Sequence, residues 1–215
     1  EEERTAGALV TTHKMDLLAA AGDLFDSLDP YARAFREVSC IAKRGGRLHG
    51  AAKDPFSSGL ALQHFLPSGH WREHPQAEAL ILGAGGAGLS LAAFLLRPEQ
   101  GADRPARITV SDVSPANLAT CREVLARLPQ SPGAELSLLE PRPGRGNDEL
   151  LAALPPGSLV VNATGLGKDR PGSPVSGAAR FPAEGYAWEF NYRGELEFLR
   201  QARARQEALR LSVED

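Results

Sequence analysis

The chain has 215 residues and a formal net charge of −3, and 42% of its residues are hydrophobic while 24% are charged. This length and balance allow one large domain or two small ones with a sizeable packed core. The lack of a basic run argues against a nucleic-acid partner, and the lack of a long apolar run argues against a membrane partner. Cys40 and Cys121 lie far apart in no metal-like spacing, which predicts reduced buried thiols, no metal site and a cytoplasmic location.

The first third of the chain alternates short strand and helix patterns. The predicted elements are a strand over 8–12, helices over 15–28 and 31–36, strands over 37–42 and 48–50, and a helix over 54–66. The apolar face predicted for the helix over 15–28 consists of Leu17, Leu18, Ala21, Leu24, Phe25 and Leu28. Gly45-Gly46 indicates a hairpin turn, and Asp54-Pro55 indicates an N-cap followed by the first helical position. The polar segment 67–76 is interpreted as a linker between two domains.

From residue 79 onward, strands and helices alternate regularly. The predicted strands are 79–82, 107–112, 135–139, 158–164 and 186–190, and the predicted helices are 89–96, 115–128, 147–154 and 195–209. Such alternation predicts an α/β fold, a Rossmann-type doubly wound parallel sheet, here preceded by a smaller α/β substrate domain.

A glycine-rich turn joins the first of these strands to its helix. Gly83, Gly85 and Gly88 have G-x-G-x-x-G spacing, which allows a tight turn, a close approach of the backbone to a pyrophosphate and close packing of helix on strand. The helix N-terminus then presents free N–H groups to the phosphates. The residues predicted to bind the cofactor here are Gly83, Ala84, Gly85, Gly86, Ala87 and Gly88. A merely structural glycine turn is the alternative.

Two other strand ends carry residues that suit a dinucleotide. Asp112 would accept hydrogen bonds from the ribose hydroxyls and repel the 2′-phosphate of NADP, so NAD is favoured over NADP. The alternative is a solvated Asp that caps the next turn. Asn162, Ala163, Thr164 and Gly165 follow a near-continuous apolar strand, at the end where open parallel sheets bind ligands. An ordinary strand-to-loop turn is the alternative there.

Lys14 and Asp54 are the candidate acid–base pair. An alcohol that loses a hydride must also lose a proton, which a lysine amine can accept while a neighbouring carboxylate positions it. His13 is a second candidate base. The alternative for Lys14 and Asp54 is that both are ordinary surface residues.

Several segments together resemble the shikimate/quinate dehydrogenase family, over nearly all of the chain. Residues 10–14, Val-Thr-Thr-His-Lys, resemble the family's V-T-x-P-x-K segment, although they are one residue shorter and lack the proline. The other similar segments are 28–30 with L-D-x-x-A, 37–41 with A-V-N-T, 50–54 with G-x-N-T-D, 83–88 with G-A-G-G-A/G, 161–167 with I-N-A-T-P-x-G and 189–193 with D-x-x-Y-x-P.

The resemblance implies two domains with the active site between them, a catalytic Lys14–Asp54 dyad and hydride transfer with a nicotinamide. The substrate-binding residues it implies are Thr11, Ser39, Lys53 and Tyr192. Ser39 and Ala52 stand where the family has asparagines that hold substrate hydroxyls, and Lys53 stands where it has threonine. Loss of such amides predicts an altered substrate preference, with Lys53 or Arg193 as a cation for a carboxylate.

We therefore predict an NAD-dependent oxidoreductase that acts on a secondary alcohol of a hydroxylated cyclic carboxylic acid. The expected organisation is a substrate domain at 1–70, incomplete at its N-terminus, an NAD-binding domain at 71–193, and a C-terminal helix at 194–215 that returns toward the first domain. We expect a small-molecule substrate as partner and a monomer or homodimer. A methylene-tetrahydrofolate dehydrogenase-like enzyme and a non-catalytic NAD(H)-binding regulator are the alternatives.

Overall fold

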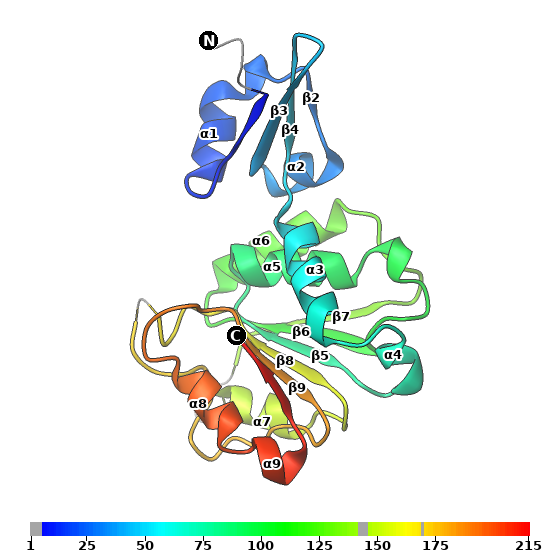
Figure 1. Ribbon diagram of the computed structural model, residues 1–215, viewed down its shortest axis with the longest axis vertical. Coiled ribbons are helices and arrows are strands. Elements are labelled where there is room, and N and C mark those ends of the chain that lie inside the picture. The colour runs from blue at the N-terminus through cyan, green and yellow to red at the C-terminus, as the bar shows by residue number, and fades with distance from the viewer. Residues whose placement is uncertain (1–5, 142–145, 169) are drawn as a thin grey trace.

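The computed structural model describes residues 6–141, 146–168 and 170–215. Within these residues the chain forms a smaller unit around a four-stranded sheet and a larger unit around a six-stranded parallel sheet. Figure 1 shows the two units one above the other, with helix α3 (Asp54–Phe65) leading from the first into the second. The arrangement confirms the predicted fold class.

The smaller sheet has the strand order β1-β3-β4-β2. Its strands are β1 (Gly7–Leu9), β2 (Ser27–Leu28), β3 (Cys40–Arg44) and β4 (Arg47–Ala51), and its helical segments are α1 (Lys14–Ala21), the 3₁₀ turn η1 (Gly22–Leu24) and α2 (Pro30–Phe35). Strands β3 and β4 form the predicted hairpin, and both glycines of its turn have positive φ, 57° at Gly45 and 76° at Gly46. A two-residue turn of that kind matches the twist of its strands, which is why the Gly-Gly pair identified it.

The predicted helix over 15–28 is wrong in its second half. Helix α1 ends at Ala21, and Ser27–Leu28 instead pairs parallel with β4. The backbone N–H of Asp26 donates to the carbonyl oxygen of Leu48, 2.9 Å away, so pairing with a distant strand replaces a local helical turn. Leu24 is consequently exposed, while Leu18, Phe25 and Leu28 pack on the small core of this unit.

The larger sheet has the order β10-β9-β8-β5-β6-β7. Its strands are β5 (Ala79–Leu82), β6 (Arg107–Ser111), β7 (Glu135–Leu139), β8 (Leu159–Asn162), β9 (Tyr186–Glu189) and β10 (Ser212–Glu214). Its helical segments are α4 (His70–Glu73), α5 (Gly86–Leu95), η2 (Pro98–Gln100), α6 (Pro115–Ala126), α7 (Gly146–Ala152), α8 (Glu197–Arg203) and α9 (Gln206–Leu209). The chain proceeds outward from β5 through β6 and β7, then resumes on the other side at β8, so the strand order reverses between β5 and β8.

The central strands are buried on both faces because helices cover each side of the sheet. Ala79 and Ile81 of β5 belong to one core cluster, together with residues of α3, α5 and α6. Leu80 and Leu82 belong to the other, with residues of α7 and α8. This alternation is the period-2 geometry of a strand, and Figure 1 shows the same two helical layers.

The linker interpretation of residues 67–76 is wrong. The segment contains α4, and its His70 and Trp71 side chains are buried. Trp71 belongs to the same core cluster as α5, and His70 Nε2 lies 2.8 Å from the Gly157 carbonyl oxygen. The segment is packed on the larger unit because its aromatic side chains remove apolar surface from water. The proposed boundary at residue 70 stays a prediction.

The C-terminal segment also differs from the single predicted helix. It forms α8 and α9 and then β10, which pairs parallel with β9 at the edge of the sheet. Arg210 has a left-handed φ of 52°, which ends α9 before the strand. Because β10 is parallel to β9, its last residues lie at the carboxyl edge of the sheet.

Both cysteines are free, and burial raises the pKa of Cys121 to about 11, whereas Cys40 is only partly buried. No described helix is long and apolar enough to cross a membrane. The described residues also contain no cluster of His, Cys, Asp or Glu that could hold a metal.

Candidate active site

The glycine turn after β5 has the geometry that its spacing predicts. Gly83 has a φ of 106°, and a Cβ there would lie 2.6 Å from the Ala163 carbonyl oxygen. A Cβ on Gly88 would collide with the Gly83 carbonyl oxygen, so α5 and β5 can pack this closely only without side chains. A Cβ on Gly85 would meet nothing within 4 Å, so the backbone is open to a ligand at that point.

Helix α5 begins at this opening with no side-chain cap. Gly85 is its N-cap, and the next residues, Gly86 and Ala87, are exposed. Their N–H groups belong to the four that no helix can satisfy internally, and the helix dipole is positive at that end. The turn can therefore accept an anionic group such as a pyrophosphate.

Asp112 is bound to the glycine turn itself. Its Oδ2 accepts hydrogen bonds from Ala84 N at 2.7 Å and from Asn117 Nδ2 at 3.2 Å, and its Oδ1 accepts one from Ser114 N at 2.8 Å. A carboxylate offers about four acceptor positions, so these three bonds leave room for a ribose hydroxyl. Asp112 therefore caps the next turn, as the alternative interpretation expected, and its carboxylate can still accept a hydrogen bond from a ligand.

The end of β8 is held by a buried polar network that the sequence did not reveal. Asn162 Nδ2 lies 2.9 Å from Glu189 Oε2, and Asn162 Oδ1 accepts from Thr164 N at 3.1 Å and Thr164 Oγ1 at 2.7 Å. Asn191 Nδ2 donates to Glu189 Oε1 at 2.8 Å. Burial raises the pKa of Glu189, and hydrogen bonds from Asn191 and Asn162 offset part of that rise. Two signals in the sequence pointed to Glu189: it is an acidic residue at the end of an apolar strand, and it stands at the acidic position of the segment 189–193 that resembles D-x-x-Y-x-P.

These loops enclose a cavity of about 510 Å³ at the carboxyl edge of the larger sheet. Its lining residues are Gly85, Ser111, Asp112, Val113, Ser114, Asn117, Pro141, Asn147, Ala163, Thr164, Leu166, Arg170, Ser173 and Pro174. The cavity therefore brings together residues from all three cofactor segments that the sequence predicted. Open α/β sheets bind ligands at this edge, where the strand order reverses.

Lys14 and Asp54 meet in the smaller unit, although 40 residues separate them. Each is the first residue of a helix, Lys14 of α1 and Asp54 of α3, and Lys14 Nζ donates a hydrogen bond to Asp54 Oδ2. The Lys14 side chain is 18% exposed and that of Asp54 is 38% exposed, so the pair remains open to solvent. Asp54 is not the N-cap; Lys53 occupies that position, and the Asp54 carboxylate binds the ammonium instead.

Glu37 is a third ionisable residue at this pair that sequence reasoning missed. It is half-buried, and the N–H of its neighbour Val38 donates to the Lys14 carbonyl oxygen at 3.4 Å. Burial raises the pKa of Glu37, the charge of Lys14 lowers it and that of Asp54 raises it. Both charges act on Glu37 only because the fold brings residues 14, 37 and 54 together. His13, by contrast, is exposed and its Nδ1 lies 3.1 Å from Asp16 Oδ2.

The predicted substrate residues occupy different surroundings. The buried Ser39 hydroxyl accepts from Lys53 N at 2.7 Å and donates to the Ala51 carbonyl oxygen at 3.4 Å. Lys53 Nζ pairs with Asp29 Oδ2 at 3.0 Å. Thr11 is exposed in the loop between β1 and α1.

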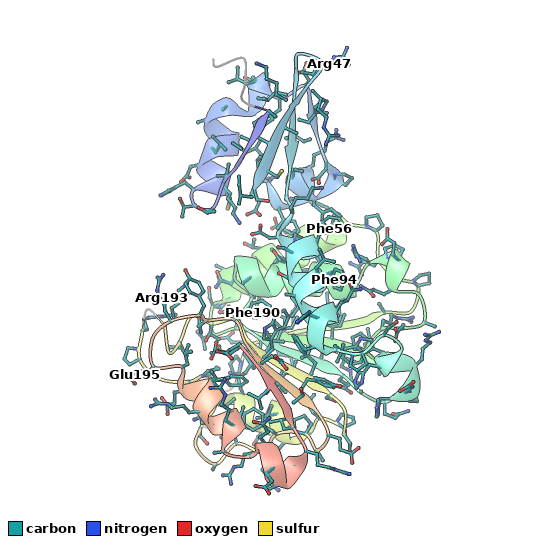
Figure 2. All side chains as sticks on the ribbon, in the orientation of Figure 1. Arg47, Phe56, Phe94, Phe190, Arg193 and Glu195 are labelled. Atoms are coloured by element: carbon teal, nitrogen blue, oxygen red, sulfur yellow. The ribbon has the colours of Figure 1, made fainter. Side chains whose placement is uncertain are left out.

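Tyr192 lies on the other unit, in the loop after β9, and is 74% exposed. Arg193 Nη1 donates to the Tyr192 hydroxyl at 3.0 Å, and Lys168 Nζ lies 5.1 Å from the centre of the Tyr192 ring. Figure 2 shows Arg193 on the side of the larger unit that is nearer the smaller one. An aromatic ring with two cations beside it suits an anionic ligand.

Fold and site together define an α/β protein with a dinucleotide-type crevice on one unit and a Lys–Asp pair on the other. No family model matches the chain. It is 33% identical over 181 residues to a shikimate dehydrogenase (NADP(+)) of Symbiobacterium thermophilum, covering 83% of this chain and 56% of the relative. It is 35% identical over 150 residues to a shikimate dehydrogenase (NADP(+)) of Methylobacterium radiotolerans, covering 69% of this chain and 46% of the relative.

Solved structures agree with these relatives. A shikimate 5-dehydrogenase of Thermus thermophilus, in complex with NADP(H) and shikimate, matches 98% of this chain and 67% of its own with a TM-score of 0.64 and 25% identity. A quinate dehydrogenase of Corynebacterium glutamicum, in complex with NAD, covers 98% of this chain and 66% of its own with a TM-score of 0.71; at 20% identity it supports the fold alone. The matches support the shikimate/quinate dehydrogenase family for this chain, which spans about half the length of the curated relatives.

Proposed function

We propose that the chain transfers a hydride between NAD and a secondary alcohol of a hydroxylated cyclic carboxylic acid of the shikimate or quinate type. The carrying observation is the Lys14–Asp54 pair, which stands at two helix starts with partial access to solvent. The names of the curated relatives support the reaction type, a dehydrogenase that acts on a CH–OH group.

Lys14 moves the proton in this proposal. Oxidation of the carbinol leaves a carbonyl, so the hydroxyl proton passes to the neutral amine of Lys14 Nζ; in the reverse direction the ammonium returns it to the carbonyl oxygen. Asp54 orients the Lys14 side chain through its hydrogen bond and stabilises the ammonium that forms. A nicotinamide cofactor supplies or accepts the hydride when bound.

The residues around the cavity at the carboxyl edge of the larger sheet fit such a cofactor. The open backbone at Gly85 and the N–H groups of Gly86 and Ala87 suit a pyrophosphate. Asp112 suits the adenosine ribose, and the wall formed by Ala163 and Thr164 suits the nicotinamide end.

The preference for NAD over NADP rests on Asp112. Its carboxylate charge would repel a 2′-phosphate, and the following residues Val113 and Ser114 supply no cation. Both curated relatives described above are named NADP(+) enzymes, so the affinities of this chain for NADH and NADPH are to be compared directly. Fluorescence titration should give at least about tenfold tighter binding of NADH than of NADPH. Tighter binding of NADPH would overturn the role of Asp112.

Replacement of Lys14 tests the proposed chemistry. We expect Lys14→Met to lower kcat by about 10²–10⁴-fold on the best substrate from a panel of cyclic hydroxy acids, because the proton acceptor is lost. Lys43→Met removes a lysine from β3 of the same smaller unit and serves as the matched control. Equal turnover by wild type and Lys14→Met would remove Lys14 from the mechanism.

Two further measurements on the wild-type protein, NAD(H) binding and turnover of folate substrates, separate the alternatives. Tight NAD(H) binding with no turnover of any alcohol would indicate a binding regulator, which the substitutions at Ser39 and Ala52 motivate. Turnover of a folate substrate would indicate the methylene-tetrahydrofolate dehydrogenase type. We further propose a monomer or homodimer, to be measured by analytical ultracentrifugation, and a cytoplasmic location.

A further inference from the structure

Glu189 is a buried carboxyl group surrounded by neutral donors. Its exposure is 1%, and the side chains of Asn162 and Asn191 beside it are also buried. Oε1 accepts from Asn191 N at 2.9 Å and from Asn191 Nδ2 at 2.8 Å, while Asn162 Nδ2 lies 3.1 Å from Oε1 and 2.9 Å from Oε2. Both oxygens therefore act as acceptors, which is the pattern of an ionised carboxylate.

The same network determines the shape of the loop after β8. Asn162 Nδ2 and Asn191 Nδ2 also donate to the Leu166 carbonyl oxygen, at 3.3 Å and 3.1 Å. Asn162 Oδ1 holds Thr164, whose Oγ1 in turn accepts from Leu166 N at 3.1 Å. Ala163, Thr164 and Leu166 line the cavity at the carboxyl edge of the sheet, so Glu189 is linked to that wall through Asn162 and Asn191.

The place of this wall determines which part of a dinucleotide it would meet. The glycine turn follows β5, Asp112 follows β6, and the Glu189 network joins the ends of β8 and β9 on the opposite side of the strand reversal. A dinucleotide that crosses the reversal point with its pyrophosphate at α5 and its adenosine at Asp112 would place its nicotinamide at the β8 side.

We propose that Glu189 is an ionised positioning residue for the cavity wall formed by Ala163, Thr164 and Leu166, where the nicotinamide ring would lie. Its charge makes the site bind the oxidised cofactor more tightly than the reduced one. The inference rests on the proposed function. An oxidised nicotinamide ring carries a positive charge and a reduced ring does not, so a fixed negative charge beneath the ring stabilises only the oxidised form. Little water intervenes to screen this charge, because Glu189, Asn162 and Asn191 are all buried.

The test compares the affinities of wild type and variants for NAD⁺ and NADH, by calorimetry or fluorescence titration. Glu189→Gln should raise the ratio Kd(NAD⁺)/Kd(NADH) by about fivefold, because only the oxidised ring loses a charge interaction. Asn191→Ser keeps the carboxylate but removes two side-chain hydrogen bonds from the network. It should weaken both affinities by the same factor and leave the ratio unchanged.

Two shorter side chains guard against a variant that fails to fold. Glu189→Asp keeps the charge and should retain the wild-type ratio Kd(NAD⁺)/Kd(NADH). Glu189→Asn introduces a side chain as long as that of Asp but without the charge, and should raise this ratio. Equal ratios in all variants would show that Glu189 acts on the loop structure alone and would overturn the proposal, as would unfolding of both neutral variants beside a folded Glu189→Asp. Wild-type protein that binds neither NAD(H) nor NADP(H) would instead overturn the proposed function.

Discussion

At the scale of single residues, the site depends on carboxylates whose neighbours differ. Asp54 binds the Lys14 ammonium, Asp112 accepts three N–H groups, and Glu37 is half-buried with its pKa affected by both Lys14 and Asp54. The sequence identified Asp112 from its position at the end of the strand after the glycine-rich helix, and the family resemblance supported Asp54. It did not identify Glu37, because no spacing rule relates residue 37 to residues 14 and 54.

Glu37 gives a pH-dependent prediction. Burial raises its pKa in the folded state, so the folded protein holds a proton that the unfolded chain releases at a lower pH. Its cost to stability is therefore absent at acidic pH, grows as pH rises toward the folded-state pKa and is complete above it. Glu37→Gln should raise Tm by about 1–2 °C at pH 7.5 and leave it nearly unchanged at pH 4. A larger rise at pH 4 than at pH 7.5, by scanning fluorimetry, would contradict this reading.

At the scale of elements, the β5–turn–α5 unit combines two different demands on glycine. Gly88 is needed for packing, since a Cβ would strike the Gly83 carbonyl oxygen. Gly85 has an ordinary φ of −69° and open space around it, so folding does not require glycine there. A requirement for glycine at position 85 must come from a ligand.

A pair of alanine variants separates these two demands. Gly88→Ala should lower the free energy of unfolding by about 1–3 kcal/mol, since helix and strand must move apart. Gly85→Ala should leave Tm within about 1 °C of wild type yet weaken NADH binding about tenfold, because its methyl group occupies the space of the pyrophosphate. Denaturant unfolding and NADH titration of both variants provide the check. Unchanged NADH affinity in Gly85→Ala would argue against phosphate binding at this turn.

At the scale of the whole molecule, α3 connects the two units. It begins with Asp54 of the Lys–Asp pair and then packs along α5 of the larger unit. Gly59 of α3 makes this close approach possible, because a Cβ there would overlap the Phe94 ring of α5. Figure 2 shows Phe94 in this position, with Phe56 nearer the smaller unit. The packing of α3 on α5 thus sets where Asp54 stands relative to the cofactor crevice.

This junction predicts a compensating pair of substitutions. Gly59→Ala should lower the free energy of unfolding by about 1–3 kcal/mol, because it overpacks the contact with Phe94. In a Phe94→Leu background the same change should cost at least about 1 kcal/mol less, since the ring is absent. Leu60→Ala, on the exposed side of α3, is the control and should change stability by less than about 0.5 kcal/mol. Additive effects of the pair in urea unfolding would refute the contact.

The sequence by itself determined five of the six strands of the larger sheet, the glycine turn and the residues at the strand ends; the edge strand β10 was not predicted. Those features follow from local rules: buried parallel strands are continuous apolar runs, and a turn near phosphate needs glycine at set positions. The family resemblance added the Lys14–Asp54 pair, which spacing alone did not distinguish from ordinary surface residues.

Only the tertiary structure decided the rest. Ser27–Leu28 became a strand because β4 offered its free edge, and residues 67–76 became packed structure because Trp71 entered the core. Glu37 and the Glu189–Asn162–Asn191 network exist only where distant segments meet. Their hydrogen bonds and pKa shifts depend on burial, which the fold creates and which no local pattern of residues expresses.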